Sequence, residues 1–429
     1  MTTVLIIAVL IGLMLGGLWV HFAVGISAVI YIVALRGLGG LSSLGLVSWG
    51  AADSYTLSAI PLFVLMAEIL LGSGLSTRLY TAITPLVRRL PGGVLNTNIF
   101  GCAIFAAVSG GSASTAAAIG TVALPELGKL GYDKRLSAGS LAAGGTLGIL
   151  IPPSITMIVY STFTETSIPK LFMAGIVPGL VLASLYVVYI MARSLANPKL
   201  APSASTPIGS VGLMKSLRDL LPFVALIGLV MGSIYGGVAT PTEAGAIGVA
   251  SALVVAASYQ SLSATILRTA LHRTLVMSGN ILFIVFVSMI FAYATTLSGL
   301  GESLAEWLRD AGLSRVGFLL AAMIFYAVLG CFMEGLGMIA ITVPIIFPTL
   351  AVYGIDPIWF GIYLVLLVEL GQLTPPLGVI LFVVASTWRE LKVEDVVYGT
   401  IPFFAIIVLF ILLLIAVPDL VLWLPNRML

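Results

Sequence analysis

Long segments without a single charged residue constrain this chain more than any other feature of its sequence. Residues 221–237, 280–297 and 401–417 are examples. As a helix, each segment is long enough to cross most or all of the roughly 30 Å of hydrocarbon in a bilayer. Because 60% of the residues are hydrophobic and only 8% are charged, the chain cannot cover a single buried core with a polar surface. The sequence therefore predicts an all-α polytopic membrane protein with about ten to twelve crossings.

The composition argues against metal, redox and nucleic-acid chemistry. Cys102 and Cys331 lie in separate apolar segments, without the spacing of a metal site or a disulfide framework. The Lys and Arg residues mark loops and form no continuous basic face. We therefore expect no cofactor and no nucleic-acid partner, with the lipid bilayer as the surrounding medium.

Enzymatic activity is not expected either. An intramembrane serine hydrolase with Ser112 or Ser114 as nucleophile would need a base within hydrogen-bond reach. The two histidines, His21 and His272, are predicted near the membrane surfaces, in ordinary polar roles. The chain also has no GxxxxGK[ST] phosphate-binding loop, so coupling to ATP within this chain is excluded.

The sequence divides into two halves that share a pattern. Residues 196–216 form a polar linker between residues 1–195 and 217–429. Asp133, Gly148 and the pair Pro152-Pro153 recur 223 positions later, as Asp356, Gly371 and Pro375-Pro376. Transporters commonly contain two such repeats in opposite orientation. We therefore predict two inverted-topology repeats.

The charges around residues 95–127 predict a re-entrant hairpin. The basic residues that flank this segment are Arg88, Arg89, Lys129, Lys134 and Arg135. Positive charge marks the cytoplasmic side, so the segment enters and leaves the membrane on that side. Its counterpart, residues 316–350, has flanks of mixed charge, as expected of a hairpin that opens outward. The two tips are then predicted to meet near the middle of the membrane.

Each half also contains a discontinuous helix, at about residues 137–160 and 357–384. Proline removes an amide donor and leaves carbonyls without helical partners, and a bound ion can satisfy them. The predicted sodium ligands at the first break are Ser109, Gly110, Ser112, Ser114, Gly148 and Pro152. Those at the second break are Gly335, Gly337, Gln372, Thr374 and Pro375. Close helix packing by Gly and Ser, with prolines that only kink the helices, is the structural alternative.

An anionic substrate would meet no Lys or Arg at mid-membrane in this topology. Helix N-termini near Ser112, Ser154 and Leu377 offer free amides and partial positive charge instead. The predicted substrate-binding residues are Ser112, Ser154, Glu334, Thr374 and Pro376. Glu334 and Glu369 are further candidates for an ion or substrate site, whereas Glu68 and Glu243 are expected to be structural hydrogen-bond partners.

Four motifs together resemble a known family over essentially the whole chain. GGSAS from Gly110, GILIPPS from Gly148, TPTEAG from Thr240 and QLTPPLG from Gln372 resemble the large membrane subunit of tripartite ATP-independent periplasmic (TRAP) transporters. The resemblance implies a bacterial inner-membrane protein with a small four-helix membrane subunit and a periplasmic substrate-binding protein as partners. It also implies sodium symport by an elevator mechanism. The second tip, MEGLGM, lacks the serines of the first, so it is expected to coordinate its ion mainly through carbonyls.

The resulting functional prediction is sodium-driven import of an organic acid anion. Sialic acid, a C4-dicarboxylate or a similar acid is the expected cargo. A carrier of the same inverted-hairpin fold that works alone on dicarboxylates or other anions is the alternative. Dependence on partner proteins would discriminate between the two.

Overall fold

The computed structural model describes residues 2–202, 213–376 and 378–428, and within these ranges the regular structure is entirely helical. Ten of the predicted linker residues, 203–212, and Leu377 lie outside the described residues. The helices of the first half are α1 (Thr2–Leu15), α2 (Val20–Arg36), α3 (Ser42–Ala52), α4 (Ala59–Gly72), α5 (Leu75–Val87), α6 (Leu95–Ser109), α7 (Ser112–Lys129), α8 (Lys134–Leu150), α9 (Ile155–Thr164) and α10 (Ile168–Ala196). Those of the second half are α11 (Leu213–Tyr235), α12 (Pro241–Ser258), α13 (Ala264–Leu297), α14 (Leu300–Asp310), α15 (Arg315–Leu329), α16 (Gly335–Val352), α17 (Pro357–Gln372), α18 (Val379–Ser386), α19 (Val393–Ala416), α20 (Asp419–Leu422) and α21 (Pro425–Met428).

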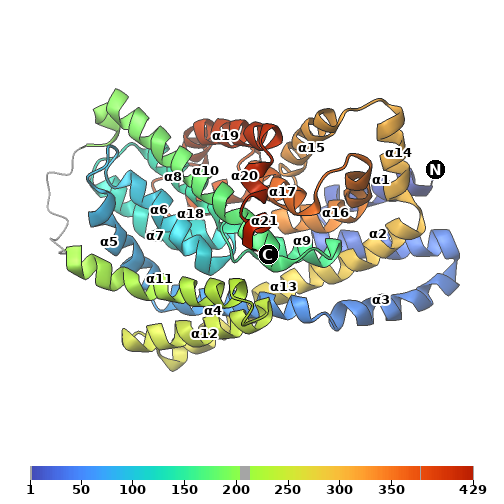
Figure 1. The fold of residues 1–429 in the computed structure, drawn as a ribbon, viewed down its shortest axis with the longest axis horizontal. Helices are drawn as coiled ribbons and strands as arrows, with labels where there is room; N and C mark the ends of the chain where they lie inside the picture. The colour runs from blue at the N-terminus through green and yellow to red at the C-terminus, as the bar shows by residue number, and fades with distance from the viewer. Residues whose placement is uncertain (1, 203–212, 377, 429) are drawn as a thin grey trace.

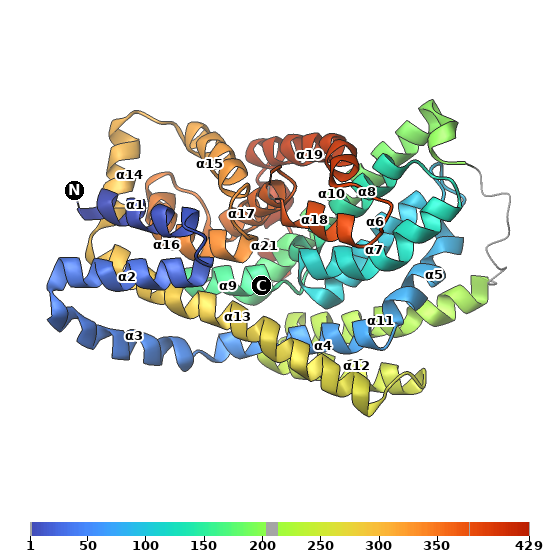
Figure 2. The ribbon, with the colours of Figure 1, turned by 180° about the vertical axis from the view of Figure 1, so that it is seen from behind.

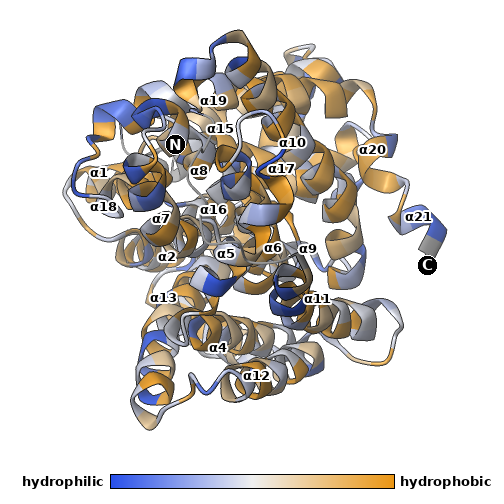
Figure 3. Cartoon of the chain, turned by 90° about the vertical axis from the view of Figure 1, so that its left-hand side faces the viewer, coloured by the Kyte–Doolittle hydropathy of each residue, from blue (hydrophilic) through white to orange (hydrophobic). Residues whose placement is uncertain are grey.

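The helices have the length and apolarity of a polytopic membrane protein. Among the described residues, 7 helical segments are long and apolar enough to cross a membrane, or 8 if the bent pair α8–α9 is one span. The sequence suggested about ten to twelve crossings. The difference arises because several apolar segments, among them α2, α6, α15 and α17, form helices too short to count as full spans. Figure 3 shows hydrophobic residues along most helices, with hydrophilic stretches mainly at helix ends and in loops.

The helices form two groups that lie side by side (Figures 1 and 2). The scaffold group consists of α2, α3, α4, α11, α12 and α13, with the long α13 packed against α2, α3 and α4. The hairpin group consists of α6–α10 and α15–α19. Helix α13 also packs against α16, so it joins the two groups.

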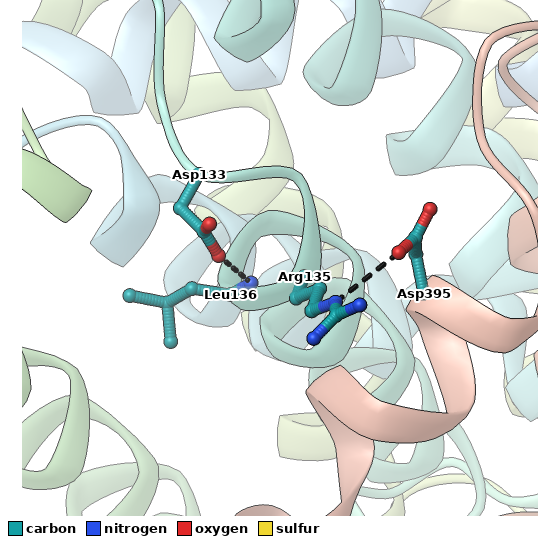
Figure 4. Close-up of polar contacts among 4 residues, drawn as sticks. All are labelled: Asp133, Arg135, Leu136 and Asp395. Carbon is teal, nitrogen blue, oxygen red and sulfur yellow. Dashed lines mark hydrogen bonds and ion pairs between the residues drawn. The ribbon is translucent and has the colours of Figure 1, made fainter.

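The first break follows directly from local sequence. Asp133 begins α8, because its carboxylate accepts a hydrogen bond from the Leu136 amide at 2.8 Å (Figure 4). The helix ends at Leu150, just before the cis peptide bond Pro152-Pro153. A new helix, α9, begins after Ser154, whose hydroxyl accepts from the Met157 amide at 3.3 Å. The apolar segment is thus divided into two helices bent by 40°.

The second break has the same parts. Asp356 begins α17 by accepting from the amides of Ile358 and Trp359 at 2.8 and 2.9 Å. The helix ends at Gln372, before the cis peptide bond Pro375-Pro376, and α18 begins at Val379. Asp133 and Asp356 therefore cap the start of the broken helix in each half, and a proline pair follows the first segment of that helix in each half.

The two halves exchange packing partners. Helix α9 of the first half packs against α16 of the second, and α18 of the second half packs against α7 of the first. Helix α8 packs closely against α19, where Gly139 and Gly399 lie opposite each other. Beside this crossing, Arg135 of α8 forms an ion pair with Asp395 of α19 at 3.2 Å (Figure 4).

A candidate transport cavity

One cavity of about 470 Å³ brings together parts of the chain that are far apart in sequence. It is lined by residues 109–114 between α6 and α7, by Glu334 and Gly337 at the start of α16, and by residues of both helix breaks, including Ile155 and Gln372. Three helices of the scaffold group, α2, α4 and α13, form the opposite wall. The cavity therefore lies between the scaffold group and the hairpin group.

Hydroxyl groups crowd the turn between α6 and α7. The hydroxyls of Ser114 and Thr115 both donate to the Gly111 carbonyl, at 3.0 and 2.8 Å. The side-chain oxygens of Ser109 and Thr115 are 2.6 Å apart. The Ser112 hydroxyl, which is buried at the cavity wall, has no hydrogen-bond partner. Of the predicted ligands at this turn, Ser112 is the one with a free side-chain oxygen.

This turn rests on the first helix break. The Gly110 carbonyl accepts from the Ile155 amide at 3.2 Å, and Gly110 adopts a left-handed conformation, with φ of +62°. A Cβ atom at Gly148 would lie 2.4 Å from the Gly111 carbonyl oxygen, so only glycine allows this approach. The structure thus brings Ser109, Gly110, Ser112, Ser114 and Gly148 together.

Two predicted residues of the first break have other surroundings. Pro152 is buried within the break and is not part of the cavity wall. The Ser154 hydroxyl donates to the Ile149 carbonyl at 2.6 Å and also caps α9, so its hydrogen-bonding capacity is largely used. Its role in substrate binding remains a prediction.

The turn between α15 and α16 rests on the second break in a similar way. A Cβ atom at Gly330 would lie 2.2 Å from the Cα atom of Gly371, the counterpart of Gly148. A Cβ atom at Gly335 would lie 2.7 Å from the Gln372 side-chain nitrogen. The Cys331 thiol donates to the Pro375 carbonyl at 3.1 Å. Both turns therefore contact a helix break through glycine.

The predicted ligands of the second break divide into two sets. Gly337 and Gln372 line the cavity, and the side-chain oxygen of Gln372 is buried without a hydrogen-bond partner. Thr374 is half-buried and donates to the Leu370 carbonyl at 2.8 Å, while Pro375 and Pro376 are exposed. Thr374, Pro375 and Pro376 do not form part of the cavity wall, and neither does the predicted ligand Gly335.

Two glutamates reach the cavity. Glu334 precedes α16 but its side chain makes no capping hydrogen bond, and it forms no ion pair with the described residues. Glu68 lines the scaffold wall and forms an ion pair with Arg273 at 3.6 Å. Glu243 lies elsewhere, in a capping box with Thr240 at the start of α12, so its predicted structural role is confirmed.

Sequence reasoning missed two other polar residues of the scaffold wall. His21, expected to have an ordinary polar role at a helix junction, lines the cavity and packs against the rings of Trp19 and Phe283. Asn280 lines it from α13. A lone asparagine in an otherwise apolar segment is the available signal, but the sequence alone does not show which helix face meets the cavity.

The fold and this cavity define a class: a polytopic α-helical transporter whose paired helix turns and helix breaks surround one central site. The chain matches the family model of the tripartite ATP-independent periplasmic transporter, DctM component, over residues 7–420. It therefore belongs to this family, as the large permease subunit of a TRAP transporter in the inner membrane.

Curated relatives agree with this assignment, and a solved transporter structure shares the fold. The C4-dicarboxylate TRAP transporter large permease protein DctM of Pseudomonas aeruginosa is 36% identical over 90% of this chain and 89% of its own length. The isethionate TRAP transporter permease protein DctMQ of Oleidesulfovibrio alaskensis is 31% identical, over 94% of this chain and 63% of that longer protein. The YdaH transporter of Alcanivorax borkumensis shares the fold, with a TM-score of 0.62 at 18% identity over 91% of this chain and 90% of that one.

Proposed function

We propose that this chain imports an organic acid anion by sodium symport, moving the hairpin group against the scaffold group. The observation that carries the proposal is the single cavity at which both turns, both helix breaks and the scaffold wall meet. A site between two groups of helices can be exposed alternately to the two sides when one group moves relative to the other. The two halves are proposed to be inverted repeats, with the α6–α7 hairpin opening inward and the α15–α16 hairpin opening outward.

Sodium is the proposed coupling ion because oxygen atoms, rather than cationic side chains, surround the turns. The first ion is proposed to lie near Ser112 and Gly148, and the second near Gly337 and Gln372. The unpartnered oxygens of Ser112 and Gln372 support these positions. A hard cation prefers such oxygen ligands, and freed backbone carbonyls at helix breaks commonly complete a sodium site.

The cargo is proposed to be a small carboxylate or sulfonate. No Lys or Arg lies among the described residues that line the cavity, so the substrate charge must be balanced by bound sodium and by helix N-termini such as that of α7 at Ser112. Two relatives are named for a C4-dicarboxylate and for isethionate, and each of these compounds contains at least one carboxylate or sulfonate group. Glu334 is proposed to contact the cargo or its ion from the second turn.

The proposed partners are a small four-helix membrane subunit and a periplasmic substrate-binding protein. The longer relative DctMQ, of which this chain covers 63%, is consistent with a second membrane subunit that can be joined to the large one. The binding protein would deliver the acid to the outward-facing cavity.

Uptake into proteoliposomes tests this function. Vesicles with this chain and the small subunit would be given a labelled C4-dicarboxylate or isethionate, with and without an inward sodium gradient and the binding protein. We expect uptake only when all components are present. Sodium-driven uptake by this chain alone would support the stand-alone carrier instead. Equal uptake with and without the sodium gradient would contradict sodium symport.

A further inference from the structure

The first turns of α13 present an apolar stripe that the described residues leave largely uncovered. The stripe borders an open depression of about 410 Å³. The residues that line it are Ala264, Leu267, Arg268, Leu271, His272 and Leu275. They all belong to one face of α13, at the spacing of successive helical turns. Leu271 is 44% exposed and Leu275 is 73% exposed, so two large apolar side chains have no protein neighbour that buries them.

The opposite face of this segment packs on α4. The Arg273 side chain forms an ion pair with Glu68 of α4 at 3.6 Å. A Cβ atom at Gly72 of α4 would lie 3.3 Å from the Ile266 side chain, and Thr274 is buried. A threonine is therefore turned toward protein while leucines are turned away from it, which is the reverse of an amphipathic helix in water. Such a face is suited to lipid.

Two basic side chains border the leucine stripe without an acidic partner. Arg268 and His272 are both exposed, and no ion pair among the described residues includes either of them. The sequence has no acidic residue between Glu243 and Glu302. Residues four apart are neighbours on a helix surface, so Arg268 and His272 can both donate hydrogen bonds to one group. The planar fork of an arginine suits a phosphate in particular.

The position of these residues along α13 indicates where that phosphate lies. Residues 274–301 contain no charged side chain, and α13 is long and apolar enough to cross a membrane. Arg268 and His272 precede this charge-free part, at the level of lipid headgroups, and basic residues mark the cytoplasmic side. Leu275 lies about 10 Å further along the helix axis than Arg268, at 1.5 Å per residue. An acyl chain that starts beside Arg268 can therefore follow the leucines into the membrane.

We propose that this face of α13 binds an anionic phospholipid of the cytoplasmic leaflet. Its phosphate lies between Arg268 and His272, and one acyl chain runs along Leu271 and Leu275. An anionic lipid fits better than a zwitterionic one, because a zwitterionic headgroup already carries a cation beside its phosphate, whereas basic residues at the membrane surface attract net negative charge. The site lies outside the transport cavity, so the proposal does not depend on the cargo or on the coupling ion.

Native mass spectrometry of the purified full chain tests the site, with phosphatidylglycerol and phosphatidylethanolamine of identical acyl chains as probes. We expect the wild type to bind one phosphatidylglycerol about tenfold more tightly than phosphatidylethanolamine, and Arg268→Gln to lose this preference. Arg268→Lys should retain most of it, because an ammonium group also binds phosphate. Arg89→Gln is the charge-matched control, since Arg89 is exposed and forms no ion pair with the described residues. It should keep the full preference.

The acyl-chain part of the site has its own variant. Leu271→Ser should weaken the binding of both lipids by a similar factor and leave the preference for phosphatidylglycerol unchanged. Unchanged binding of both lipids by Leu271→Ser would contradict the placement of the acyl chain.

Four other results would overturn the proposal. Equal affinity of the wild type for the two lipids would show that the site does not select an anionic headgroup. Equal losses in Arg268→Gln and Arg89→Gln would show attraction to the overall charge of the protein. Displacement of the lipid by inorganic phosphate would indicate an ion site without an acyl-chain contact. Loss of the lipid on addition of the small membrane subunit would assign this face to that subunit.

Discussion

Gly139 of α8 and Gly399 of α19 contact each other through their backbones. A Cβ atom at Gly139 would lie 2.0 Å from the Gly399 carbonyl oxygen, and one at Gly399 would lie 1.9 Å from the Arg135 carbonyl oxygen. Two helices from opposite halves of the chain therefore cross so closely that no Cβ atom fits between their main chains at this point. Glycine at both positions is what permits this crossing.

Gly139→Ala is expected to destabilise the hairpin group by roughly 2 kcal/mol, because the added methyl group must push α19 away. Thermal unfolding of the purified chain in detergent measures the effect. Gly228→Ala is the control, since a Cβ atom there meets nothing within 4 Å. Equal melting temperatures for the two variants would show that the crossing tolerates separation.

Removal of the neighbouring ion pair should matter much less. Arg135 and Asp395 are 3.2 Å apart, but the Arg135 side chain is 60% exposed. Exposed pairs contribute about 0–1 kcal/mol, and salt screens them. We therefore expect Asp395→Asn to lower the melting temperature less than Gly139→Ala does. A larger effect of Asp395→Asn would mean that charge, rather than close packing, holds α8 to α19.

Substitution of Glu68 and substitution of Arg273, which form an ion pair, should lower the stability of the protein by different amounts. The Glu68 side chain is 8% exposed, whereas that of Arg273 is 56% exposed. Arg273→Gln leaves a buried carboxylate without a partner, while Glu68→Gln leaves an arginine that water can solvate. Arg273→Gln is expected to be the less stable variant in thermal unfolding, and the double variant should resemble Glu68→Gln. The opposite order would show that the cavity hydrates Glu68 well.

Ser112 and Thr374 are both ligands predicted from the sequence, but their surroundings differ. Ser112 lines the cavity with an unpartnered hydroxyl, whereas the Thr374 hydroxyl donates to the Leu370 carbonyl at 2.8 Å. We expect Ser112→Ala to raise the sodium concentration for half-maximal uptake about tenfold, and Thr374→Ala to raise it less. Sodium titration of uptake measures both. A similar sodium concentration for half-maximal uptake in Ser112→Ala and the wild type would show that Ser112 is not a sodium ligand.

Gly148→Ala tests the contact between the first turn and the first helix break. The new methyl group would lie 2.4 Å from the Gly111 carbonyl oxygen, so the turn must shift. We expect sodium-dependent uptake to fall by at least tenfold while the protein still folds, because ion ligands tolerate displacements of only a few tenths of an ångström. Normal uptake by a folded Gly148→Ala variant would contradict a tightly fitted ion site at this contact.

The sequence predicted an all-α membrane protein and its family, and both are confirmed. It also indicated where helices would break, because a Pro-Pro pair removes two amide donors wherever it occurs. Capping by Asp133 and Asp356 is local chemistry of the same kind. Such features depend on residues within one or two turns of each other.

The composition of the cavity wall depends on contacts that no local pattern encodes. Ser112 and Thr374 are similar hydroxyl residues beside similar motifs, yet Ser112 lines the cavity and Thr374 donates to the last turn of α17. His21 and Asn280 became neighbours of the site only because α2 and α13 pack across from the hairpin group. The sequence therefore identified the turns and breaks of the candidate site more readily than its scaffold wall.

The exchange of packing partners between α9 and α16, and between α18 and α7, has a consequence for any shorter relative of this fold. A polypeptide equivalent to one half would have a broken helix whose second segment lacks the hairpin helix of the other half that packs against it here. Two such polypeptides could complete each other only as a pair. Closure of the structure is thus a property of the two halves together.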